Sequence, residues 1–197
     1  MAIEIVEAPS AVRLRTLRPV SDDELLELSM RNPELRLERT AGGELIIMPP
    51  SGAESGRRCL GAASQLAAWA GRDGSGLAFD SSAGFRLPDG SVRAADAAWV
   101  RKDRWEALTR EEREKYAPLC PDFVLELRSP SDRLADLEGK LAEWIANGAR
   151  LGWLIEPFER QVQVYQPGAS VARLDAPERL SADPVLPGFV LDLASVW

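Results

Sequence analysis

The segment from residue 121 to residue 155 constrains the fold more than any other part of the chain. It opens with PDFVLELRSPSD, in which residues 122–128 read as a strand, continues with a helical pattern over 133–147, and ends in an apolar strand over 150–155. A strand, a helix and a second strand in succession are typical of a crossover connection within one sheet. We therefore expect a fold of the α/β (α+β mixed) class, with a mixed β-sheet flanked by helices.

Further helices and strands are predicted around that unit. The chain of 197 residues has the length of one domain, which we expect to span residues 1–197. A helix is expected from Ser51 to about Gly71, with an apolar side formed by Leu60, Ala63, Leu66, Ala67 and Ala70. The other expected elements are a capped helix after Ser21, turns at Gly42-Gly43 and Pro88-Asp89-Gly90, a strand from Asp96 to Val100, a charged helix from Lys102 to Tyr116, and a strand from Gln161 to Tyr165.

The composition excludes several chemistries. The chain contains no histidine, which removes Ser-His-Asp and Cys-His nucleophile systems and His-ligated zinc, so acid–base work falls to carboxylates and lysine. Two cysteines are too few for a disulfide framework or a four-ligand zinc site, and we expect Cys59 and Cys120 to be buried free thiols. A net charge of -7 argues against broad attraction to phosphate backbones, so a role on nucleic acid requires a local basic groove or a bound cation.

The sequence also carries no signal for a membrane. No stretch approaches the ~20 uninterrupted apolar residues of a membrane span. The first residues, MAIEIVEAPS, lack the basic-then-apolar layout of a secretory signal. We expect a cytoplasmic protein.

A carboxylate interrupts the apolar strand over 122–128. With a period of two, Glu126 shares one face with Asp122, Val124 and Arg128, while three apolar side chains share the other face. An unpaired carboxylate among apolar neighbours is costly, so Glu126 needs a cation, a hydrogen-bond donor or a metal ion nearby. Arg128 meets that need only in part, because i,i+2 neighbours on a strand lie ~7 Å apart. The alternative is a surface strand with an ion pair on its solvent side.

The helix that follows carries a candidate partner for Glu126. Its buried stripe is read from Leu134, Leu137, Leu141, Trp144 and Ile145. Lys140 lies ~40° from Trp144, on the rim of this stripe, and can reach towards the preceding strand. The alternative is a surface lysine that pairs with Glu143 or with a neighbour such as Asp136.

Four stretches of the sequence carry a family resemblance. The stretches PDFVLELRSPSD and DLEGKLAEWIANGARLGWLIEP, with VRAADAAWV and PPSGAESGRR upstream, resemble the Uma-type family of predicted restriction endonucleases. This family was formerly a domain of unknown function and is placed in the PD-(D/E)XK nuclease superfamily. The resemblance covers roughly residues 20 to 167. It implies a restriction-endonuclease-like core over about 20–167, followed by a C-terminal extension over 168–197.

The resemblance also implies a set of site residues. The superfamily has an acidic residue at the start of one strand, a second on the next strand, and a lysine that orients or activates water. Asp96 is the counterpart of the first, although Ala94-Ala95 replaces the Ser-Pro that the family typically shows, and Glu126 is the counterpart of the second. Asp122 shares a strand with Glu126 and is therefore not the first acid. The third motif position holds Arg128, which stays protonated, so the resemblance points to Lys140 as the functional amine.

Glu54 matches an acidic residue at the start of the first long helix of the family, and is the fourth catalytic candidate. It falls opposite the apolar side assigned to that helix. An exposed first-turn glutamate stabilised by the helix dipole explains it equally well.

This set of residues suits metal-dependent hydrolysis of DNA phosphodiester bonds. Asp96 and Glu126 would hold a divalent ion, Mg²⁺ or else Mn²⁺, through hard oxygen ligands, while Lys140 positions water or stabilises charge. DNA is the expected partner, with candidate backbone contacts at Arg57, Arg58, Arg86, Arg93, Arg101 and Lys102.

Two other readings are consistent with the same residues. The first is a catalytically inactive nuclease-fold module that serves as a binding protein or assembles as a homodimer. The second is a structural ion-pair cluster of Asp96 and Glu126 with Arg128 and Lys140.

Overall fold

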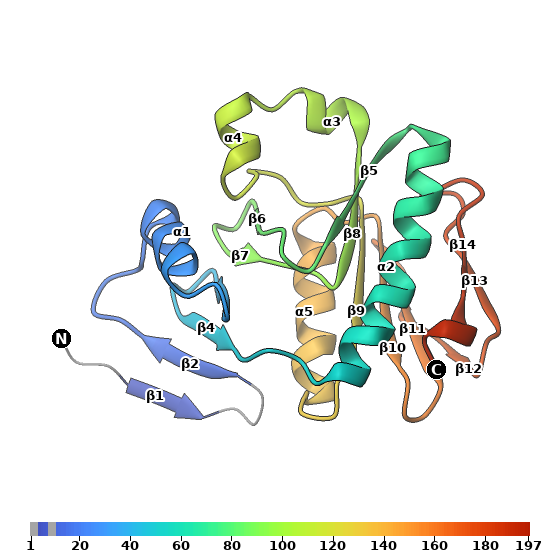
Figure 1. The fold of residues 1–197 in the computed structure, drawn as a ribbon, viewed down its shortest axis with the longest axis horizontal. Helices are drawn as coiled ribbons and strands as arrows, with labels where there is room; N and C mark the ends of the chain where they lie inside the picture. The colour runs from blue at the N-terminus through green and yellow to red at the C-terminus, as the bar shows by residue number, and fades with distance from the viewer. Residues whose placement is uncertain (1–3, 8–10) are drawn as a thin grey trace.

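The chain is built around two six-stranded sheets (Figure 1). The structure, a computed structural model, describes residues 4–7 and 11–197; residues 1–3 and 8–10, part of the stretch read for a secretory signal, lie outside it. The N-terminal sheet has the order β1 (Glu4–Glu7), β2 (Val12–Arg15), β4 (Leu45–Met48), β3 (Arg36–Arg39), β7 (Val92–Arg93) and β6 (Phe85–Arg86). The central sheet has the order β12 (Ala172–Asp175), β11 (Gln161–Tyr165), β10 (Leu151–Glu156), β9 (Phe123–Leu127), β8 (Ala97–Arg101) and β5 (Gly76–Asp80).

The predicted crossover is present in the central sheet. Strands β9 and β10 pair in parallel and are joined by α5 (Leu134–Ala146), whereas the other pairs in this sheet are antiparallel. All five residues of β9 are buried, because helices cover both faces of the sheet. The expectation of a mixed β-sheet flanked by helices is confirmed.

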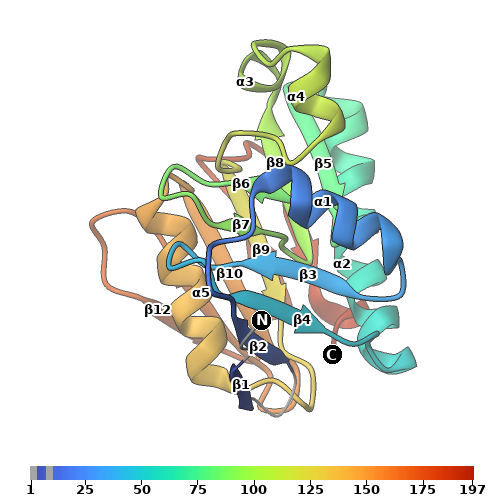
Figure 2. The same cartoon turned by 90° about the vertical axis from the view of Figure 1, so that its left-hand side faces the viewer.

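Two long helices pack on opposite faces of the central sheet. On α2 (Ala53–Asp73), Leu66 and Trp69 join one core cluster with Phe123. On α5, Leu141 and Trp144 join a second cluster that includes Val124, on the other face of β9. Figure 2 shows α5 and α2 on either side of strands β8 to β10. The face of β9 that carries Glu126 is therefore the face under α5.

The buried side of α2 differs from the prediction. Leu60, assigned to the apolar side, is 68% exposed, and Ala67 is exposed too. Ala62 and Trp69 are buried instead, because the Trp69 ring packs 5.8 Å from that of Trp99 in β8. Because this helix is rich in alanine, its sequence does not show clearly which side is buried.

The helix predicted from Lys102 to Tyr116 is two short helices, α3 (Lys102–Glu106) and α4 (Arg110–Glu114). Thr109 caps α4 by accepting from the Glu112 N–H, and the Glu112 side chain accepts from the Thr109 N–H. This capping box begins a new helix and so breaks the predicted one. The same device at Ser21 and Glu24 starts α1 (Asp22–Arg31), as predicted.

The C-terminal segment packs against the central core. It forms β13 (Arg179–Ser181), β14 (Val190–Asp192) and a short 3-10 helix (Leu193–Ser195), and Phe189 lies 5.4 Å from the Trp69 ring of α2. A single domain over residues 1–197 with an extension from residue 168 stays a prediction. None of the described helices is long and apolar enough to cross a membrane.

Candidate active site

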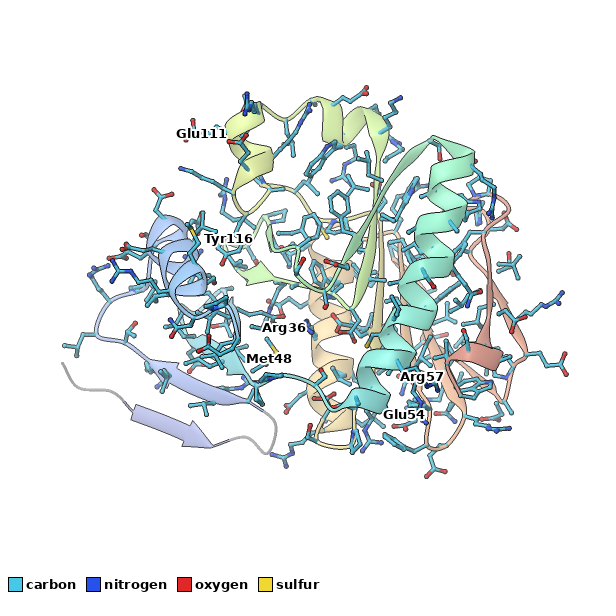
Figure 3. All side chains as sticks on the ribbon, in the orientation of Figure 1. Arg36, Met48, Glu54, Arg57, Glu111 and Tyr116 are labelled. Atoms are coloured by element: carbon cyan, nitrogen blue, oxygen red, sulfur yellow. The ribbon has the colours of Figure 1, made fainter. Side chains whose placement is uncertain are left out.

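A cavity of about 450 Å³ opens beside the junction of the two sheets and gathers all four predicted site residues. Its wall includes Asp96 before β8, Glu126 on β9, Lys140 on α5 and Glu54 on the first turn of α2. Arg36 from β3 and Cys59 from α2 also line it. Figure 3 shows Arg36 and Met48 on the side of the N-terminal sheet near α5, with Glu54 at the start of α2.

The ladder between β8 and β9 brings Asp96 and Glu126 together. Ala97 pairs with Leu125 in antiparallel register. Asp96, the residue before Ala97, therefore lies opposite Glu126, the residue after Leu125, and both are on the same face of the sheet. The Leu127 N–H donates to Asp96 Oδ2 at 2.8 Å, which holds this carboxylate at the end of β9. The side chain of Glu126 is 3% exposed and that of Asp96 is 13% exposed.

Lys140 reaches from α5 to Glu126, as its place on the rim of the helix stripe predicts. Its Nζ lies 3.0 Å from Glu126 Oε1, 3.1 Å from Glu38 Oε1 and 2.7 Å from the Ala94 carbonyl oxygen. The contacts with Glu38 and Ala94 are hydrogen bonds, and the contact with Glu126 is an ion pair. The alternative of a surface pair with Glu143 is wrong, because Glu143 binds Arg93 instead.

Trp144 fixes the other side of Glu126. Its indole N–H donates to Glu126 Oε1 at 3.0 Å, so this single oxygen both accepts from Trp144 and pairs with the Lys140 ammonium. In the part of the chain that the structure describes, no hydrogen bond reaches Glu126 Oε2. One carboxylate oxygen is therefore held in place while the other keeps its full capacity as an acceptor or ligand.

Glu38 on β3 was missed by the sequence reading. It is 2% exposed, pairs with Lys140 and accepts from Arg93 Nη1 at 3.0 Å. Arg93 Nη2 in turn donates to Glu143 on α5 at 2.5 Å. An RLER strand gives no local signal for this role, because charged side chains are mostly exposed and the partners of Glu38 lie far along the chain.

The charges of the cluster are strongly coupled. Burial raises the pKa of Glu126 to about 7; Lys140 opposes this shift, whereas the carboxylates of Asp96 and Glu38 add to it. Burial also acts against the charge of Glu38, yet Lys140, Arg93 and Arg36 lower its pKa to about 2. For Lys140, burial is outweighed by Glu126 and Glu38, which raise its pKa. The site thus holds a lysine that stays charged and one carboxylate, Glu126, whose negative charge the nearby cations do not fully balance.

The remaining sequence candidates have other partners. Glu54 is exposed and binds Arg57 and Arg58 at the cavity rim. Asp122 is buried away from the cavity, where it binds Arg104 at 2.9 Å, in line with its exclusion as the first acid. Arg128 binds Glu156 rather than Glu126, so the predicted ion-pair cluster does not include it.

The predicted basic contacts do not form one groove. Arg93 is buried in the Glu38 network, and Arg101 and Lys102 lie at the far end of β8 from Asp96. Arg57 and Arg58 lie near the cavity through their pairs with Glu54. Arg86 pairs with Asp22.

Both cysteines are free thiols, as predicted. Cys120 is buried, but Cys59 is partly exposed, so the prediction that Cys59 is buried is wrong. Cys59 is half-buried on the wall of the cavity, and burial raises the pKa of both thiols to about 12. A protonated thiol is a poor metal ligand.

The oxygen donors of the cavity fit a hard divalent cation. No group of three histidine, cysteine or acidic side chains forms a dense ligand cluster among the described residues. Magnesium does not require one, since it keeps several waters and is usually bound by one or two carboxylates plus substrate phosphate. Asp96 and Glu126 supply two carboxylates, and Glu126 Oε2 has no other partner in the described chain.

Comparisons with known proteins agree on the family and the fold. A crystal structure titled as "a putative nuclease belonging to DUF820" from Anabaena variabilis ATCC 29413 superposes with a TM-score of 0.70 at 22% identity, covering 85% of this chain and 91% of that one. No curated protein matches the chain significantly. The family profile described as "Uma2: Putative restriction endonuclease" matches residues 22–194. The profile match supports a nuclease-like function, and the structure match shows the fold. With most of its length matched by that profile, the chain belongs to the Uma2 family and has a restriction-endonuclease-like fold.

Proposed function

We propose that the protein is a metal-dependent endonuclease that hydrolyses phosphodiester bonds of DNA. The observation that carries this proposal is the position of Asp96 and Glu126 across one strand pair, with the Lys140 ammonium 3.0 Å from Glu126, in a single cavity. Two carboxylates and an amine on a strand–strand–helix frame are the groups that such hydrolysis needs. The raised pKa of Glu126 supports the proposal, because a bound cation would offset the excess of negative charge.

Each residue has a defined task in this proposal. Asp96 and Glu126 would hold Mg²⁺ or Mn²⁺ through their oxygens. When bound, the ion would supply Lewis-acid chemistry, lowering the pKa of a bound water and offsetting charge on the phosphate. Lys140 keeps a positive charge next to the reacting groups and orients the Glu126 carboxylate. Trp144 and Leu127 donate hydrogen bonds that fix the two carboxylates.

A catalytically inactive nuclease-fold module is the second candidate, and one observation favours it. The protein supplies counter-charges to the cluster: Arg36 Nη1 lies 3.3 Å from Asp96 Oδ1, and Lys140 pairs with Glu126 and Glu38. A site of this kind is stable without a metal ion. In this case Asp96, Glu126 and Lys140 form a structural ion-pair cluster, and the protein acts by binding a partner or a second copy of itself.

A cleavage assay separates the two candidates. Purified protein is incubated with single-stranded and duplex DNA of mixed sequence, with Mg²⁺, Mn²⁺ or EDTA. We expect metal-dependent cleavage that is lost in Glu126→Gln and Lys140→Met. Glu156→Gln is the matched control, because Glu156 is a buried glutamate on the neighbouring strand that pairs with Arg128 and does not line the cavity.

Cleavage that persists in both site variants would point to a contaminating nuclease. Absence of cleavage of every substrate under all metal conditions would favour the inactive module.

A further inference from the structure

Arg36 is the cavity residue whose hydrogen-bonding capacity is least used. Its Nη1 lies 3.3 Å from Asp96 Oδ1, its Nη2 lies 3.5 Å from the Ala94 carbonyl oxygen, and its buried Nε has no hydrogen-bond partner among the described residues. These distances lie beyond those of strong charge-assisted bonds, which are about 2.7–2.9 Å. A guanidinium with five donors is held here by two long contacts.

Another arginine of the same strand shows what a structural role looks like. Arg39 donates to the Val20 carbonyl at 2.5 Å, to Asp22 at 2.6 Å and to the Gly90 carbonyl at 2.7 Å. Three short bonds explain why this side chain is buried. Arg36 has no comparable set, and its side chain is 31% exposed at the cavity.

The other cation of the cavity, Lys140, already has partners within the protein. Of the described residues that line the cavity, Arg36 and Lys140 carry positive charge. Lys140 donates to Glu38 and to the Ala94 carbonyl and forms an ion pair with Glu126. Arg36 is therefore the cavity cation with more donors left for a negatively charged ligand.

We propose that Arg36 is the phosphate-binding residue of the site, and that it holds a non-bridging oxygen of the DNA backbone at the reacting phosphodiester. This inference rests on the proposed function. The planar guanidinium can offer two parallel N–H donors to a phosphate, which an ammonium cannot do. Its contact with Asp96 is long, so a phosphate competes well for it, above all when Asp96 serves as a metal ligand.

DNA binding tests the proposal without relying on turnover. The probe is a short fluorescent DNA of mixed sequence, single-stranded and duplex, followed by anisotropy in Ca²⁺ so that binding is read in the absence of cleavage. The proteins are wild type, Arg36→Met, Arg36→Lys and the control Arg110→Met, whose arginine pairs with Glu114 outside the cavity.

We expect Arg36→Met to weaken DNA binding by about 10- to 100-fold, the loss of one charge-assisted hydrogen bond. Arg36→Lys should fall between Arg36→Met and wild type, and Arg110→Met should bind as wild type does. The slope of log K against log salt should fall by about one in Arg36→Met, since one phosphate contact is lost.

A titration with Mn²⁺ shows whether Arg36→Met keeps an intact site. Loss of a cation beside Asp96 should leave the Mn²⁺ affinity unchanged or raise it. Equal DNA affinity in Arg36→Met and wild type would overturn the proposal, as would a joint loss of Mn²⁺ and DNA binding or a wild type that binds no DNA. Failure of the proposed function gives a different result, namely DNA binding that depends on Arg36 without cleavage in Mg²⁺ or Mn²⁺.

Discussion

Replacement of Lys140 by methionine tests the buried charge network. In the wild type the Lys140 ammonium lies 3.0 Å from Glu126 Oε1 and 3.1 Å from Glu38 Oε1. The variant removes this positive charge and leaves the repulsion between the two carboxylates. The side chains of Lys140 and Glu126 are 12% and 3% exposed, so solvent does little to replace the lost partner. Loss of one member of a buried ion pair costs about 3–5 kcal/mol, which is the expected fall in the free energy of unfolding at about pH 8.5.

The size of this effect should depend on pH. The pKa of Glu126 is raised to about 7, above its ordinary value of 4.5, so the folded protein binds this proton more tightly than the unfolded chain does. Stability from such a group is present at low pH and is lost as the pH rises through about 7. Loss of Lys140 raises this pKa further, so the destabilisation should shrink towards about pH 5.5, by about 1.4 kcal/mol for each unit of added shift.

Urea unfolding followed by tryptophan fluorescence at the two pH values provides the assay. Lys102→Met is the matched control, because Lys102 is 57% exposed and should change stability by less than about 0.5 kcal/mol. The double variant Glu126→Gln with Lys140→Met should recover part of the loss, since it removes one of the uncompensated charges. An equal effect at both pH values, or a loss below about 1 kcal/mol, would refute the reasoning.

Four further results are expected. Trp144→Phe should lower the free energy of unfolding by about 1.5–3 kcal/mol in urea titrations, because Glu126 loses a buried donor. Asp122→Asn should weaken the bond to Arg104 and destabilise by about 1–3 kcal/mol, with Mn²⁺ affinity in calorimetry unchanged. Glu54→Gln should leave Mn²⁺ affinity as it is, since this side chain is exposed and bound to arginines. The Mn²⁺ affinity of the wild type should fall as the pH drops through about 7, because protons compete for Glu126.

Local patterns were sufficient to predict the frame of the site. The strand–helix–strand order gave the parallel pair of β9 and β10, and the period of two set Glu126 on the face under α5. The helical step placed Lys140 on the rim of the α5 stripe, within reach of that strand. These features depend on neighbours in the chain, and therefore they are visible in the sequence.

Long-range partners could not be predicted in the same way. Arg36 and Glu38 come from a second sheet, 60 and 102 residues away from Asp96 and Lys140 in the chain. Their spacing within the RLER strand is that of any solvated strand, and only the folded chain brings Arg36 to Asp96 and Glu38 to Lys140. The direction of the α2 stripe was missed for a related reason: alanines pack on either side, and the ring of Trp69 decides which side is buried.

The central claim is that Asp96 and Glu126 hold one divalent cation together. Calorimetric titration of the wild type with Mn²⁺ at about pH 8, above the pKa of Glu126, tests it most directly. The account predicts binding of a single ion that is lost in Asp96→Asn and in Glu126→Gln, and that persists in Glu156→Gln. Absence of binding to the wild type, or equal binding by all the variants, would contradict it.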